Sequence, residues 1–193
     1  MKRIIGVAVA VAWLAASAGA TTEPKSPPSS RTNSGSGTSG PGGQMRIAGR
    51  LYVGDPAPDF ELPSSRDRKV TLSHQKGDWL LMVFASDRDD FGQVSAIYEE
   101  CGAIGVRIFG MCRDNPQSLR TTAQKQNIPF EMLADPTGEI SSIYGLYDAL
   151  HRTCVPGFVV VDRLGVVKLV VSGQQVPARQ MLELTRLTVE ESS

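Results

Sequence analysis

Cysteine is scarce in this chain of 193 residues, which contains Cys101, Cys112 and Cys154. Three cysteines exclude more than one internal disulfide and leave at least one thiol over. The odd count is a hint of redox use in an exported protein. The alternative interpretation is that all three side chains are small hydrophobic groups in the core.

An excess of charge of either sign is also missing. The chain has 20 Lys+Arg and 20 Asp+Glu. Removal of residues 1–20 takes away Lys2 and Arg3 and no acidic residue, which leaves 18 basic against 20 acidic residues and a net charge of −2. This balance gives no electrostatic basis for binding nucleic acid or an anionic membrane. We therefore expect no nucleic-acid partner.

The N-terminus lacks a hydrophobic run of full membrane-spanning length. Its apolar stretch covers residues 4–20, only 17 residues, whereas a span usually takes roughly 20 predominantly apolar residues. Lys2 and Arg3 precede the stretch, and small residues suited to cleavage stand at Ala18 and Ala20. This pattern predicts a signal peptide over 1–20. We expect an exported protein, periplasmic or extracellular, without stable membrane insertion after cleavage; an uncleaved N-terminal anchor is the alternative.

Composition divides the rest of the chain into a linker and one domain. Residues 21–46 are almost wholly Ser, Thr, Gly, Pro and other polar types. Such a segment buries too little apolar surface to offset its ordering entropy, so we predict a flexible linker. The overall hydrophobic content of 41% is that of a normal globular protein, and we predict one domain over 47–190.

The pattern of apolar residues predicts an α/β domain. A buried strand at 79–85 leads through an acidic loop into a helix from Gly92, the first half of a βαβ unit, and Cys101 falls on the apolar face of that helix. The other predicted elements are a short strand or hairpin at 60–72, a strand at 106–111, helices at 116–128 and 135–145, a hairpin at 158–171 and a helix from Pro177 with Met181, Leu182, Leu184 and Leu187 as apolar contacts. This order predicts a mixed central sheet flanked by helices.

The loop after the central strand is where chemistry is expected, because free N–H groups at a helix start favour an anion or an ionised nucleophile. Residues 86–92 are SDRDDFG, which contain no cysteine, serine–histidine pair or phosphate-loop pattern. The acidic run 87–90 lacks the ligand spacing of a calcium loop. We interpret it as an exposed turn with an internal Arg–Asp pair, and we predict no metal site and no cofactor.

Four stretches resemble a known family: VGDPAPDFELP at 53–63, VTLSHQKGDWLLMVF at 70–84, the segment 109–146, and GFVVVDRLGVV at 157–167. Through them, residues 52–189 are similar to the peroxiredoxin (AhpC/TSA, redoxin) group of thioredoxin-fold proteins. The resemblance implies a thioredoxin-like fold and membership of the antioxidant, thiol-oxidoreductase class. None of the four stretches is a catalytic motif.

The resemblance also implies a catalytic motif, P-x-x-x-T-x-x-C, whose cysteine thiolate attacks a peroxide and becomes a sulfenic acid. Alignment puts Ser86, Asp90 and Gln93 at the proline, threonine and cysteine, and Pro156 at the usual arginine. A glutamine amide cannot attack a peroxide, and the acidic loop raises the energy of a thiolate. The standard peroxidase mechanism is therefore not expected. An alternative alignment with W-A-S-W-C-P-P-C of exported disulfide reductases puts Arg88 and Phe91 at its two cysteines.

Cys154 and Cys112 are the remaining candidate catalytic residues, since each is expected at the edge of the sheet that carries the lost site. Their strands flank the central one, roughly 10 Å apart, whereas a disulfide needs Cα atoms nearer than about 7 Å, so we expect no resting bridge. Val155-Pro156 resembles the cis-proline site of thioredoxins, and His151 and Arg152 are expected in a solvated loop.

Two classes of function stay open. The first is an exported thiol oxidoreductase that works through Cys154 or Cys112, with a thiol reductant or protein partner at the sheet edge. The second is a non-catalytic binding or scaffold module that retains the thioredoxin fold, since fold alone does not decide function. The oligomeric state and the enzymatic competence stay open with them.

Overall fold

The computed structural model describes residues 51–173 and 175–192. They belong to one compact unit, Gln44–Ser193. The predicted signal peptide at 1–20 and linker at 21–46 lie outside the described residues. In the described part of the chain, no helix is long and apolar enough to cross a membrane.

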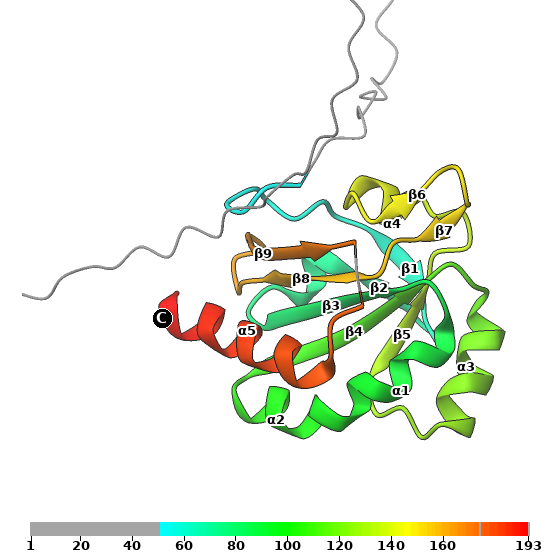
Figure 1. The fold of residues 1–193 in the computed structure, drawn as a ribbon, viewed down its shortest axis with the longest axis horizontal. Helices are drawn as coiled ribbons and strands as arrows, with labels where there is room; N and C mark the ends of the chain where they lie inside the picture. Colours follow the sequence, from blue (N-terminus) through cyan, green and yellow to red (C-terminus); the bar gives the residue numbers. More distant parts are fainter. Residues whose placement is uncertain (1–50, 174, 193) are drawn as a thin grey trace, which may run out of the picture. The chain divides into compact units, whose positions relative to one another are not determined.

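A five-stranded sheet forms the centre of the domain, in the order β5-β4-β3-β8-β9 (Figure 1). Its strands are β3 (Trp79–Ala85), β4 (Val106–Cys112), β5 (Glu131–Ala134), β8 (Gly157–Val161) and β9 (Val167–Ser172). The central strand β3 runs parallel to β4 and antiparallel to β8. All seven residues of β3 are buried, as expected of a strand covered on both faces. The predicted mixed sheet flanked by helices is confirmed.

Helices and a small hairpin cover the two faces. One hydrophobic cluster packs the sheet against α1 (Phe91–Val94), α2 (Tyr98–Ala103), α3 (Pro116–Lys125) and α5 (Ala178–Glu191) (Figure 1). The other cluster packs it against β1 (Glu61–Pro63), β2 (Lys69–Thr71), the 3-10 helix η1 (Leu72–Gln75) and the end of α4 (Glu139–Ile143). The short 3-10 helices η2 (Arg88–Asp90) and η3 (Ser95–Ile97) flank α1. Cys101 is buried in the first cluster, as predicted.

Strand β5 is the main element that the sequence analysis missed. Its four residues are all buried, but their sequence, EMLA, opens on a glutamate and contains no β-branched or aromatic residue. They therefore show neither the apolar run of strand length nor the alternation that predicts a strand. The preceding helix ends at Lys125 rather than continuing to Pro129. The two-residue strands β6 (Tyr147–Asp148) and β7 (Thr153–Cys154), which pair with each other, were also missed.

Two helix assignments were wrong in detail. Helix α4 begins at Glu139 rather than at Asp135-Pro136, because residues 135–138 form a turn that ends on Gly138 with a left-handed φ of 74°. The Asp135 carboxylate accepts the N–H of Ser141, inside the helix. In α5, Leu187 is 54% exposed, while Thr185 is buried and donates its hydroxyl to the Met181 carbonyl. A hydroxyl that bonds to its own helix can occupy a core position that a polarity pattern assigns to the surface.

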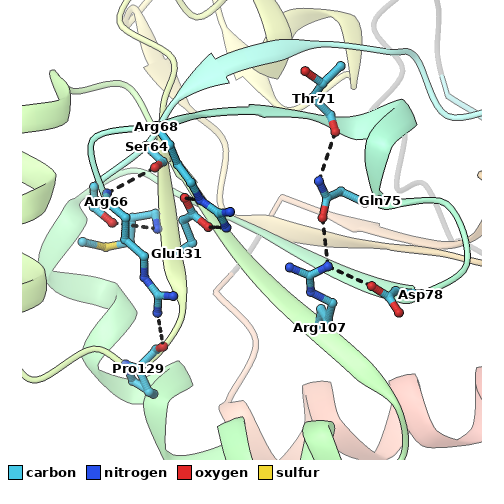
Figure 2. Close-up of polar contacts among 11 residues, drawn as sticks. Ser64, Arg66, Arg68, Thr71, Gln75, Asp78, Arg107, Pro129 and Glu131 are labelled. Carbon is cyan, nitrogen blue, oxygen red and sulfur yellow. Dashed lines mark hydrogen bonds and ion pairs between the residues drawn. The ribbon is translucent and has the colours of Figure 1, made fainter.

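The turn of the β1–β2 hairpin covers the open edge of β5 (Figure 2). Ser65 donates its N–H to the Met132 carbonyl at 2.8 Å, and its hydroxyl oxygen accepts the Met132 N–H at 3.2 Å. Arg68 holds the Glu131 carboxylate with two hydrogen bonds, and that side chain is 4% exposed. An uncovered edge strand invites pairing with other chains, so these contacts protect the sheet.

Candidate functional site

A small pocket lies where β3 ends and α1 begins. Its volume is about 30 Å³, room for roughly one or two water molecules. Three separate parts of the chain line it: Val83, Phe84, Ala85, Asp90, Gln93, Val94, Pro156, Gly157, Gln175, Val176, Ala178 and Met181. The tertiary structure therefore brings Asp90, Gln93 and Pro156 together, as the sequence alignment predicted. Ser86, the fourth aligned position, is exposed just after β3 and is not part of the lining.

The acidic loop beside the pocket is tied to neighbouring elements. Asp87 accepts the N–H of Asp89 at 3.0 Å and so caps η2. Arg88 pairs with Asp114, after β4, so the prediction of an Arg–Asp pair inside the loop was wrong. Although burial acts to raise the pKa of Asp114, the hydrogen bond from Arg88 lowers it below its usual value. Asp114 was missed because its partner is 26 positions away in sequence.

None of the pocket residues carries a thiol. Gln93 is exposed in α1, and its amide has no hydrogen-bond partner among the residues that the structure describes. All three cysteines are free and buried elsewhere. Burial raises the pKa of Cys101 to about 11, with Glu100 adding to the effect, and the pKa of Cys112 to about 12. Since the thiolate is the nucleophilic form of cysteine, burial disfavours the reactive form of both thiols.

The sequence profile of the AhpC/TSA family matches residues 53–170. The chain belongs to the AhpC/TSA family. The chloroplastic peroxiredoxin Q of Sedum lineare is 29% identical over 149 residues, which cover 73% of this chain and 80% of that protein. The chloroplastic peroxiredoxin Q of Populus jackii is 28% identical over 149 residues, which cover 73% and 70%.

Solved structures show the same fold for this AhpC/TSA domain. The peroxidoxin BcpB of Mycobacterium tuberculosis superimposes with a TM-score of 0.65 at 18% identity, over 75% of this chain and 99% of that one. At this identity the likeness is one of fold. The family match, the related sequences and the shared fold together confirm the predicted peroxiredoxin-like, thioredoxin-fold family.

Cys154 lies outside the pocket of this AhpC/TSA domain, in a buried polar chain. Its sulfur is 3.2 Å from the Ser141 hydroxyl oxygen, and that hydroxyl donates to the Asp135 carboxylate at 2.8 Å. Because the single hydroxyl proton of Ser141 goes to Asp135, the Cys154 thiol is left to donate its own proton to Ser141. Burial is the largest cause of the raised pKa of Cys154. The sequence signal of these hydrogen bonds was the position of Asp135, six residues before Ser141.

Cys112 and Cys154 approach the same sheet edge, as expected. Cys112 is the last residue of β4, and the side chain of the next residue, Arg113, donates to the carbonyl of Arg152, two residues before Cys154, at 3.1 Å. The two thiols are close enough for the charge of one to raise the pKa of the other. Their assignment as catalytic residues stays a prediction.

The remaining loop residues are solvent-exposed. His151 Nδ1 is 2.6 Å from the Asp148 carboxylate, and both His151 and Arg152 are exposed, which fits the expected solvated loop. No peptide bond in the described ranges is cis, so the Val155-Pro156 bond differs from the cis-proline site that it resembles. No cluster of three His, Cys, Asp or Glu side chains that could hold a metal ion is found within 51–173 and 175–192.

Proposed function

We propose that this AhpC/TSA protein is exported, does not carry out the family's cysteine peroxidase reaction, and retains the fold as a binding module. The observation that supports this most strongly is the pocket at the end of β3. Its lining holds Asp90, Gln93 and Pro156 and no thiol. Peroxide reduction through a cysteine needs a sulfur that forms a sulfenic acid at this place, and no residue of the lining can supply it.

The chemistry of the pocket favours binding of a neutral polar group. The Gln93 amide offers both N–H donors and a carbonyl acceptor. Asp90 adds a carboxylate, which opposes binding of an anion or formation of a thiolate. Most of the remaining lining residues are apolar, among them Val94 and Met181. A backbone amide or a hydroxyl of a protein partner at this sheet edge fits these groups better than an ionised substrate does.

Peroxide consumption tests the loss of the peroxidase reaction. The purified protein is fully reduced, supplied with a dithiol reductant and hydrogen peroxide, and compared with a variant in which Cys101, Cys112 and Cys154 are all changed to Ser. We expect the same rate for both proteins. A rate for the wild type well above the variant and above free thiol would refute the proposal.

Export has its own test. The basic start, the short apolar stretch and the small residues at Ala18 and Ala20 support a cleaved signal peptide. We expect N-terminal sequencing of protein recovered from the periplasm or the medium to begin at residue 19 or 21. Recovery of the intact N-terminus in the membrane fraction would support the uncleaved anchor instead.

A relocated thiol site is the second candidate function. The observation that favours it is the hydrogen bond from the Arg113 side chain, next to Cys112, to the carbonyl of Arg152, two residues before Cys154. The two cysteines are thus placed at one edge. If the wild type does consume peroxide, single Cys112→Ser and Cys154→Ser variants would identify the thiol that reacts first.

A further inference from the structure

A second hollow lies at the opposite end of the parallel strands from the Gln93 pocket. It is bounded by the first residues of β4 and by Glu131 at the start of β5, whereas the Gln93 pocket lies beyond the last residue of β3. Its volume is about 210 Å³. The lining consists of Arg66, Arg68, Tyr98, Glu99, Gly102, Val106, Arg107, Ile108, Phe109, Pro129, Phe130 and Glu131. It shares no residue with the Gln93 pocket.

Three guanidinium groups from two parts of the chain line this hollow, and each keeps free donors (Figure 2). Arg66 uses Nη2 for the Pro129 carbonyl, at 2.6 Å. Arg107 uses Nη1 for Gln75 and Asp78, at 2.9 and 2.8 Å. The remaining side-chain donors of Arg66 and Arg107, namely Nε and one terminal nitrogen of each, have no acceptor among the described residues. They are available to a ligand that accepts hydrogen bonds.

The charges of the hollow are unevenly compensated. Glu131 is fully engaged by Arg68, and Asp78 pairs with Arg107. Arg66 forms no ion pair with a carboxylate within the described ranges, but its charge helps to lower the pKa of Glu131, so it is partly compensated. Glu99 is the opposing group, an exposed carboxylate in α2 that also lines the hollow. An anion would therefore be attracted by Arg66 and repelled by Glu99.

The hollow also has an aromatic side. Its accessible ring is that of Tyr98, because Phe109 and Phe130 are only 2% and 3% exposed. The Arg107 guanidinium lies over the Phe109 ring, 5.7 Å from its centroid. Tyr98 is partly exposed at the hollow. A planar guanidinium matches two oxygens of a carboxylate or phosphate, and aromatic walls favour a flat apolar body.

We propose that this hollow binds a small organic oxyanion, a carboxylate or a phosphate, attached to a flat apolar group. Arg66 and Arg107 hold the oxyanion, and the exposed ring of Tyr98 contacts the apolar group. Arg68 is committed to Glu131 and keeps the hairpin turn in place. This inference is independent of the function proposed for the Gln93 pocket.

The test uses three probes and NMR titration of the full chain. Phenyl phosphate carries both the oxyanion and the ring, inorganic phosphate carries only the oxyanion, and benzyl alcohol carries only the ring. The backbone N–H signals of Gly102 and Ile108 and the Nε–H signals of Arg66 and Arg107 report on the hollow directly. We expect saturable shifts of these signals, with phenyl phosphate binding about fivefold or more tightly than either of the other two probes.

Two variants with opposite expected effects on the affinity for phenyl phosphate distinguish binding in this hollow from a general effect of net charge. Arg66→Ala should weaken phenyl phosphate binding about fivefold, because it removes a charge-assisted hydrogen bond. Glu99→Gln should strengthen binding by about twofold, because it removes the opposing charge from an exposed position. Arg163→Ala is the matched control: Arg163 is exposed in the β8–β9 turn and lines none of this hollow. It should leave the affinity unchanged.

Several results would overturn the proposal. Shifts that do not saturate, or that centre on other parts of the chain, would show that the hollow is not the site. Equal losses of affinity in Arg66→Ala and Arg163→Ala would show that binding depends only on the net charge of the protein. Because Glu99 is exposed in α2, the Glu99→Gln variant gives a result even if Arg66→Ala unfolds, and no gain in its affinity would equally count against the site.

Discussion

Removal of the Arg68 guanidinium leaves a nearly buried carboxylate without its partner. Glu131 is 4% exposed, and both of its oxygens accept from Arg68, whose own side chain is 56% exposed. Loss of one partner from a fully buried pair costs about 3–5 kcal/mol. Solvent at the arginine reduces this, so we expect Arg68→Ala to lower the free energy of unfolding by about 2 kcal/mol at pH 7.

The pH dependence of this loss identifies its cause. Burial acts to raise the pKa of Glu131, but the hydrogen bonds from Arg68 and Ser64 outweigh it and lower the pKa below its usual 4.5. A carboxyl whose pKa is lower in the folded state contributes stability above its unfolded pKa, and this stability is lost as the pH falls through the folded pKa. The difference between wild type and Arg68→Ala should therefore be largest near pH 7 and should shrink below pH 4.5.

Urea unfolding of both proteins at pH 7 and at pH 3 measures this difference. Glu131→Gln and the double variant complete a cycle that separates the pair from the loss of the arginine's own packing. A difference below about 0.5 kcal/mol at pH 7, which is the size of an ordinary surface ion pair, would refute the reasoning. A difference of equal size at both pH values would refute the electrostatic explanation.

Three further predictions concern the core and the thiols. Gly110→Ala should destabilise the domain by about 1–3 kcal/mol in thermal unfolding, because the added Cβ would lie 2.8 Å from the Phe91 ring. A second substitution in the same chain, Phe91→Leu, should recover part of the lost stability. If Gly110→Ala alone is as stable as the wild type, the described packing is contradicted. The three buried thiols should react with Ellman's reagent only after unfolding in guanidinium, so rapid reaction of any of them in buffer would contradict their burial. The thiol introduced by Gln93→Cys should alkylate at a lower pH when Asp90→Thr accompanies it, since the nearby carboxylate disfavours the thiolate; identical pH profiles of the single and double variants would show that Asp90 does not act on this position.

Much of the fold was accessible from local patterns. The strand at 79–85, the hairpin near 158–171 and the helix after Asn115-Pro116 were predicted because β-branched runs, turn residues and helix caps act over a few neighbouring residues. Strand β5 was not predicted, because its sequence, EMLA, is short, opens on a glutamate and has no β-branched residue. Its place in the sheet depends on β4 and on the turn that contains Ser65.

The candidate site was predicted in part. The alignment placed Asp90, Gln93 and Pro156 at three positions of the site that the resemblance implies. The structure brings these three residues to one pocket. It did not indicate that Arg88 would pair with Asp114 or that Cys154 would lie beside Ser141. Those contacts depend on how the loops after β4 and before β8 pack, which no local pattern contains.

By itself, the sequence determined that no thiol stands in residues 86–93, after the central strand, because the identity of a side chain is a covalent property that folding does not change. Only the tertiary structure decided the state of the three cysteines that remain, because burial sets the cost of forming a thiolate. It also decided that Arg66 and Arg107, 41 positions apart in the chain, line one hollow. Their proximity follows from the packing of the β1–β2 turn against the sheet.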